Sequence, residues 1–245
     1  MKSIYLFILA ACISFSATAQ TRFFSTVKIE FEKTLAVHQL FKEIEPEWYE
    51  RIKDHMPAQN ISYYDFIGDT TQSIYKPGRE VAQNTRNFFG NIADNNVVYN
   101  NYKTETTISQ KPVFEETFLV QDSLADIKWK LTADTRTIAG YECRKAIGTL
   151  NDSITVFAFY TDELLVTGGP EGIHGLPGMI LGVGVPRIHT TWFATKVEVF
   201  DVNMNVVKPA TKGKKVNRAD MIELLDKVLK QWGPYGNKLV INYMI

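Results

Sequence analysis

Apolar and polar residues alternate along much of the chain, which is typical of strands with one buried face. The alternation is clearest from Val27 to Phe31, which reads Val-Lys-Ile-Glu-Phe. Further strand-like segments follow at short intervals, at 97–107, 113–120, 127–131, 141–150, 154–160, 179–185 and 190–202. Strands joined by short connections predict a mainly antiparallel β-sheet that is curved and open, or a half-barrel. Between 68 and 96 the pattern is weak and rich in turn-forming residues, which predicts a loop.

Two segments instead carry apolar residues at helical spacing. The apolar stripe of the first consists of Val37, Leu40, Phe41, Ile44, Trp48 and Ile52. Pro46 lies within this stripe, and because proline fits the first turn of a helix, we expect the helix to kink or restart there. The second helix is predicted from Asn217, as N-cap, to Trp232, with Gly233-Pro234 ending it. The expected fold class is therefore α+β, mainly antiparallel β, with two packed helices.

The first nineteen residues are typical of a signal peptide. Lys2 is followed by an apolar run over 5–15 and by Ala17-Thr18-Ala19, a small-x-small cleavage pattern. The run is shorter than the roughly 20 residues that span a membrane, and no later segment predicts a transmembrane helix. We expect an exported, periplasmic protein with one β-rich domain over 20–245. An alternative is a lipobox at 9–12, in which Cys12 carries a lipid anchor.

Composition narrows the function classes. The chain has 245 residues, 27 basic and 27 acidic side chains and 45% hydrophobic residues, which is typical of a globular protein. The balanced charge argues against a nucleic-acid partner. Two cysteines, one of them in the predicted signal peptide, exclude a disulfide framework and a four-thiolate zinc site.

The segment from Tyr160 to Trp192 is rich in glycine and proline. Pro177-Gly178 fits the two central positions of a type II turn. The segment lacks the lysine of a phosphate-binding loop and the glycine spacing of a dinucleotide site. A structural turn and a ligand cradle both remain open.

These residues also carry a resemblance. The motif Gly175-Leu176-Pro177-Gly178-Met179-Ile180 resembles the signature of the GLPGLI family, exported proteins of Bacteroidota whose function is largely uncharacterised. Residues 140–146, 158–161 and Gly169-Pro170 resemble further segments of that family. Met179, Phe159 and Leu164-Leu165 depart from its pattern. The resemblance implies a fold similar to the curved open sheet of periplasmic lipoprotein carriers, which hold acyl chains, and it brings no catalytic residues.

Catalysis and metal binding have weaker support. The chain has no Gly-x-Ser-x-Gly elbow and no His-Glu-x-x-His helix, so we expect neither an enzyme nor a cofactor. His174, His189 and Cys143 are candidate ligands for copper or zinc, although Cys143 also fits a small buried strand residue. Five basic residues between 208 and 218 fit a solvated loop or a contact with an acidic partner or lipid headgroups.

The expected function is that of a non-enzymatic binding protein. Its ligand is predicted to be an apolar molecule, such as an acyl chain, or a peptide segment in the curved sheet. Tyr160 and Trp192 are candidate wall residues because amphipathic aromatic rings suit a partly wet groove. The edge of the site is predicted at Gly175, Leu176, Pro177, Gly178 and Met179. The alternatives are a protein-interaction accessory of an outer-membrane transport system and a periplasmic copper or zinc protein.

Overall fold

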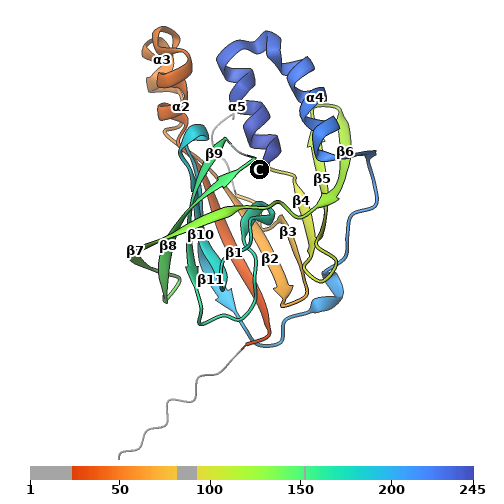
Figure 1. The fold of residues 1–245 in the computed structure, drawn as a ribbon. Helices are drawn as coiled ribbons and strands as arrows, with labels where there is room; N and C mark the ends of the chain where they lie inside the picture. Colours follow the sequence, from red (N-terminus) through yellow and green to blue (C-terminus); the bar gives the residue numbers. More distant parts are fainter. Residues whose placement is uncertain (1–23, 82–92, 152) are drawn as a thin grey trace, which may run out of the picture.

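The structure is a computed structural model and describes residues 24–81, 93–151 and 153–245 (Figure 1). The predicted signal peptide and the alternative anchor at Cys12 lie outside the described residues. Within the described ranges, no helix combines the length and the apolar character that crossing a membrane requires.

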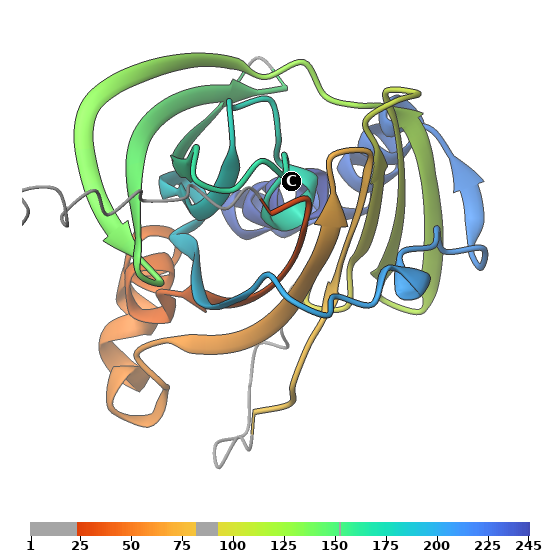
Figure 2. The ribbon, with the colours of Figure 1, turned by 90° about the horizontal axis from the view of Figure 1, so that it is seen from below.

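Twelve strands of the described residues form one open sheet in the order β12-β6-β5-β4-β3-β2-β1-β11-β10-β9-β8-β7. They are β1 (Thr26–Leu35), β2 (Asn60–Asp69), β3 (Gln72–Pro77), β4 (Val97–Asn101), β5 (Thr106–Val113), β6 (Glu116–Ser123), β7 (Lys128–Ile138), β8 (Tyr141–Leu150), β9 (Ile154–Thr161), β10 (Met179–Val185), β11 (Thr190–Glu198) and β12 (Lys214–Val216). Neighbours pair antiparallel, except that β12 runs parallel to β6. Figure 2 shows how the sheet curves around the end of the chain. The predicted open, mainly antiparallel sheet is confirmed.

Several strands have the predicted bounds, including β8 and β10, but the strand predicted over 97–107 is wrong. Two strands form there, β4 and β5. The side chain of Asn101 accepts hydrogen bonds from the backbone N–H groups of Lys103 and Thr104, at 3.0 and 3.1 Å. Such a side chain competes with the strand ladder for backbone donors and so creates a turn.

The loop predicted from residue 68 is also wrong in its first part, where β2 ends and β3 forms. Phe66 and Ile67 of β2, and Ile74 and Tyr75 of β3, are all buried. Because consecutive residues are buried on both faces of these strands, the sequence lacks the alternation that identifies a half-buried strand. Residues 82–92 of the predicted loop lie outside the described residues.

The helices begin as predicted but are more numerous. Pro46 divides the first segment into α2 (Val37–Ile44) and α3 (Pro46–Ile52). The second segment forms α4 (Arg218–Leu229), and the Asn217 side chain accepts a hydrogen bond from the Asp220 N–H at 2.8 Å, which confirms the predicted N-cap.

The dipeptide Gly233-Pro234 starts a further helix, α5 (Gly233–Met244), instead of only ending the helical segment. Proline is accepted in a first turn, so the same two residues end one helix and begin the next. A Cβ atom at Gly236 would lie 2.1 Å from the carbonyl oxygen of Leu229, so glycine is required where α5 crosses the end of α4. The C-terminal end of α5 lies inside the curve of the sheet (Figures 1 and 2).

The core fills the inside of this curve. Its largest fully buried side chains include Trp192, Tyr64, Tyr75, Tyr160 and Phe31. Ile241 and Ile245, at the end of the chain, pack in the same cluster. Most of the concave face is therefore packed with the protein's own side chains.

The turn before β10 differs from the predicted type II turn. Gly178 has φ +144°, and its N–H donates to the carbonyl oxygen of Leu176 at 2.8 Å, which closes a turn of three residues. Met179 pairs directly with Thr161, so β10 begins one residue after Gly178. A Cβ atom at Gly178 would lie 2.0 Å from the carbonyl oxygen of Thr161, so close packing against the end of β9 requires glycine here.

Candidate functional site

An apolar groove of about 520 Å³ lies on the face of β9–β11 opposite to the side chains of Tyr160 and Trp192. Phe157 and Phe159 of β9 and Phe193 of β11 form its aromatic wall, and each is partly exposed. Gly184 lies between them on β10, and a Cβ atom there would meet only the Thr191 side chain, at 3.8 Å. The missing side chain of Gly184 thus leaves the middle of the groove open.

The hairpin of β7 and β8 curls over one end of this face. The Arg136 guanidinium lies 4.5 Å from the centre of the Phe193 ring and 5.9 Å from that of Phe159. The Lys145 ammonium lies 5.3 Å from the centre of the Phe157 ring and forms an ion pair with Asp134 at 3.1 Å. Two cations therefore stand against aromatic faces beside the groove, a favourable arrangement for both.

The other end of the groove is fixed by an ion-pair network. Glu43 of α2 contacts His189 Nε2 at 2.5 Å and accepts a hydrogen bond from the Lys238 ammonium at 2.7 Å. Hydrogen bonding by Lys238 and then by His189 lowers the pKa of the Glu43 carboxyl. This network joins α2, the β10–β11 connection and α5, and so holds α2 beside the groove.

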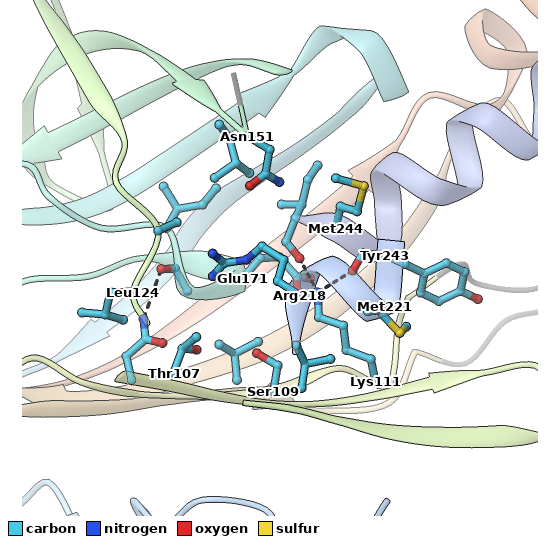
Figure 3. Close-up of a pocket in the computed structure, with 18 of the residues that line it drawn as sticks. Thr107, Ser109, Lys111, Leu124, Asn151, Glu171, Arg218, Met221, Tyr243 and Met244 are labelled. Atoms are coloured by element: carbon cyan, nitrogen blue, oxygen red, sulfur yellow. Dashed lines mark hydrogen bonds between the residues drawn. The ribbon is translucent and has the colours of Figure 1, made fainter. Parts of the chain in front are cut away.

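A second cavity of about 70 Å³ lies between β4–β6, the start of α4 and the end of α5 (Figure 3). Its lining is mostly apolar, and we call it the polar cavity for the buried polar groups that it contains. Its polar lining residues are Asn100, Thr107, Ser109, Lys111, Asn151, Glu171, His174 and Arg218. Glu171 is 7% exposed and has φ +53°, a left-handed backbone that only a few non-glycine residues adopt. Glu171 and Arg218 lie in the middle of the view in Figure 3.

Burial shifts the pKa values of two charged side chains in the cavity, Lys111 and Glu171. Burial lowers the pKa of the Lys111 ammonium to about 8, and burial raises the pKa of the Glu171 carboxyl, which Lys33 and Lys111 oppose. Lys111 donates to the carbonyl oxygens of Tyr243 and Ile245 at 2.7 and 2.6 Å. These bonds attach the end of α5 to β5.

His174 lines the same cavity. Its Nδ1 lies 2.9 Å from the carbonyl oxygen of Gly172, and burial lowers the pKa of its ring. The indole N–H of Trp129 donates to the His174 carbonyl oxygen at 2.9 Å. The loop that leads to the signature motif is therefore held against β7 at this point.

The residues predicted as a ligand-binding wall lie elsewhere. Tyr160, Trp192, Leu176 and Met179 are buried in the core, at 4% exposure or less. They line neither the groove nor the cavity. Of the signature motif, Gly175 and Pro177 are exposed and Gly178 is partly exposed.

The predicted metal ligands are not brought together. His174 lines the cavity, His189 contacts Glu43 beside the groove, and the described residues contain no group of three or more His, Cys, Asp or Glu side chains that could hold a metal ion. Cys143 is fully buried on β8, and burial raises the pKa of its thiol to about 11. A thiol with this pKa is a poor nucleophile at neutral pH.

Sequence reasoning missed Phe157, Phe159 and Phe193, yet the pattern contains their signal. Phe159 and Phe193 directly neighbour Tyr160 and Trp192, and consecutive strand residues point to opposite faces. Once Tyr160 and Trp192 are assigned to the core, their neighbours must face outward.

Residues 80–225 match the family model described as the N-glycanase peptide, N-terminal domain. This match covers more than half of the chain. The chain belongs to this family. The matched range contains β4 to β12 and most of α4, but not α5, whose end lines the polar cavity. The GLPGLI resemblance rests on its motif, and the family match does not bear on it. No curated protein matches the chain.

Two solved structures of PNGF-II have a fold similar to that of this chain. The structure of PNGF-II in the C2 space group aligns with a TM-score of 0.51 and 17% identity, over 80% of this chain and 32% of that chain. The structure in the P21 space group gives 0.52 and 16%, over 82% and 33%. The chain therefore spans about a third of the length of the solved structures it matches.

Proposed function

We propose that the protein is a non-enzymatic binding protein, and that its site for an apolar ligand is the groove walled by Phe157, Phe159 and Phe193. The observation that carries this proposal is the groove itself, which encloses about 520 Å³ and has a largely apolar lining. Pockets for small molecules commonly enclose roughly 300–1,000 Å³. Burying the three rings against a ligand contributes roughly 25 cal/mol for each Å² removed from water.

The charges beside the groove favour a ligand with an anionic end. Arg136 and Lys145 stand over its aromatic wall, and Lys145 also forms an ion pair with Asp134 at 3.1 Å. A fatty acid satisfies both features, because its chain lies on the phenylalanines while its carboxylate faces the cations. The curved open sheet is similar to that expected for a lipoprotein carrier, but the ligand surface we propose is the outer face, since most of the concave face is packed.

The experiment is a titration of the purified protein with a fluorescent fatty acid. We expect saturable binding, which Phe159→Asp weakens by at least tenfold. Phe114→Asp is the matched control, because Phe114 is 56% exposed and lies outside the groove. Gly184→Leu is a second variant, since it fills the open middle of the groove without displacing backbone. Absence of saturation, or equal affinity in Gly184→Leu, contradicts the proposal.

A second candidate function is that of a protein-interaction module, which binds a partner protein of the cell envelope. It is favoured by the family match, because the related structures are about three times longer than the aligned part, and by β7, which forms an edge of the sheet. An extended segment of an envelope partner would pair with this edge. Hydrogen exchange tests it: a stoichiometric partner recovered from envelope extract should slow exchange of the backbone amides over 128–138.

A further inference from the structure

The polar cavity contains buried atoms that have no hydrogen-bond partner. Among the described residues, these include Glu171 Oε1, Asn100 Oδ1 and Asn151 Nδ2. Glu171 and Asn100 are 7% and 1% exposed. Leaving a buried polar atom unpaired costs about 1–3 kcal/mol, so three such atoms around one hollow indicate a place that a ligand completes.

The unpaired atoms are of two kinds. Glu171 and Asn100 present acceptors, although the other oxygen of Glu171 already accepts from the Asn96 amide at 3.2 Å and the Asn100 amide already donates to Gly172 at 3.1 Å. Asn151 presents a donor. A ligand that completes all three therefore both donates and accepts hydrogen bonds.

The lining of the cavity also carries both signs of charge. Glu171 is the acidic group in its lining, while Lys111 and Arg218 are the basic ones. Lys111 uses two of its three N–H groups on α5, and Arg218 donates to the Ser123 carbonyl oxygen at 3.1 Å. Both cations retain donors for an anionic group. In Figure 3 Arg218 extends into the middle of the cavity from the start of α4.

Size limits the ligand. A cavity of about 150 Å³ holds the six carbon atoms of one benzene molecule, so about 70 Å³ encloses roughly three non-hydrogen atoms by the same proportion. The other atoms of a larger ligand extend toward the partly exposed Arg218. This excludes a saccharide or a nucleotide from the enclosed part. It leaves small molecules with two opposite charged ends.

We propose that this cavity binds a small zwitterion of the size of glycine. The ligand's ammonium group faces the unpaired acceptors of Glu171 and Asn100. Its carboxylate faces the donors of Lys111, Arg218 and Asn151. This site is separate from the groove, and the proposal does not depend on the proposed function.

The test is a titration followed by NMR, using the side-chain amide signals of Asn100 and Asn151. Glycine and L-alanine are compared with acetate, methylammonium and glycerol, each at concentrations up to about 10 mM, which detects millimolar dissociation constants. We expect saturable shifts with glycine and at least tenfold weaker binding of the other three small probes. Equal affinity for acetate or for methylammonium overturns the proposal in favour of a simple anion or cation site, and no binding by any probe shows a cavity that holds water alone.

Substitutions test which side chains bind the ammonium group of glycine and which bind its carboxylate. Glu171→Gln keeps the shape of the side chain and is expected to weaken glycine binding at least tenfold. Arg218 is partly exposed at the mouth of the cavity, and Arg218→Gln should also weaken glycine binding at least tenfold. This second variant keeps the test valid if Glu171→Gln does not fold. Lys215→Gln on β12 is the matched control, because Lys215 is exposed and does not line the cavity. Unchanged affinity in both Glu171→Gln and Arg218→Gln overturns the proposal.

Discussion

Phe159 and Tyr160 are consecutive residues of β9 whose side chains lie on opposite faces of the sheet. Tyr160 is 1% exposed and packs in the core, whereas Phe159 is partly exposed and lines the outer groove. Because consecutive side chains of a strand point to opposite faces, the sheet itself lies between the two rings. The ligand surface that we propose is therefore the face opposite to Tyr160 and Trp192, the two aromatic residues that the sequence suggested as the wall.

The signature glycine Gly178 is expected to be a stability determinant. Its φ of +144° and the 2.0 Å approach of a Cβ atom to the Thr161 oxygen make Gly178→Ala strained and overpacked, at a cost of about 3 kcal/mol. Gly140→Ala is the control, because a Cβ atom there meets nothing within 4 Å and only its φ of +87° opposes it, at about 1 kcal/mol. Urea unfolding measures both, and equal losses would contradict the close-packing account.

Leu176 is expected to act as a core residue and not as a ligand contact. It is 4% exposed, so Leu176→Ala should cost about 3 kcal/mol of unfolding free energy. Leu165→Ala removes the same atoms at a position that is 49% exposed and should cost less than about 0.5 kcal/mol. Chemical denaturation of the two variants gives the comparison, and a stable Leu176→Ala would refute the burial argument.

The start of α4 depends on the cap at Asn217. Asn217→Ala removes the acceptor of the Asp220 N–H and is expected to cost about 1 kcal/mol, while Asn217→Ser keeps an acceptor and should cost little. Thermal unfolding monitored by circular dichroism distinguishes them. Identical midpoints for the alanine and serine variants would show that the cap contributes nothing.

His174 is expected to make stability fall in mildly acidic solution. Burial lowers the pKa of its ring below the ordinary 6.5, so the folded state favours the neutral form. The stability that this provides is complete above pH 6.5 and is lost as the pH falls through the lower, folded-state pKa. The unfolding free energy of the native protein should therefore decrease over this interval more steeply than that of His174→Gln. A native slope in His174→Gln would contradict the prediction.

Local patterns predicted the elements that are buried on one face. The bounds of β8, the restart at Pro46 and the cap at Asn217 follow from alternation, proline geometry and side-chain capping. β10 is buried on both faces, and its bounds follow instead from the short run of apolar residues and glycines after Gly178. Elements buried on both faces gave no alternation, and β3 was missed for that reason. The helix α5 was missed because Gly233-Pro234 can end a helix as well as begin one.

The polar cavity could not be predicted from local sequence patterns, and the physical reason differs from that for β3. On β5 the inward residues are Thr107, Ser109 and Lys111, while Ile108 points outward and is partly exposed. Alternation alone assigns the opposite orientation. The inward orientation depends on oxygen atoms supplied by α5 and on Glu171, more than 50 residues away along the chain, which no local pattern contains.

The central claim is that an apolar ligand lies on the outer face of β9–β11. It is tested most directly by NMR with a fatty acid that carries a paramagnetic label near the middle of its chain. The account predicts selective broadening of the ring signals of Phe157, Phe159 and Phe193, with the rings of Tyr160 and Trp192 broadened much less. Broadening centred on Tyr160 and Trp192, or no saturable broadening at all, would contradict it.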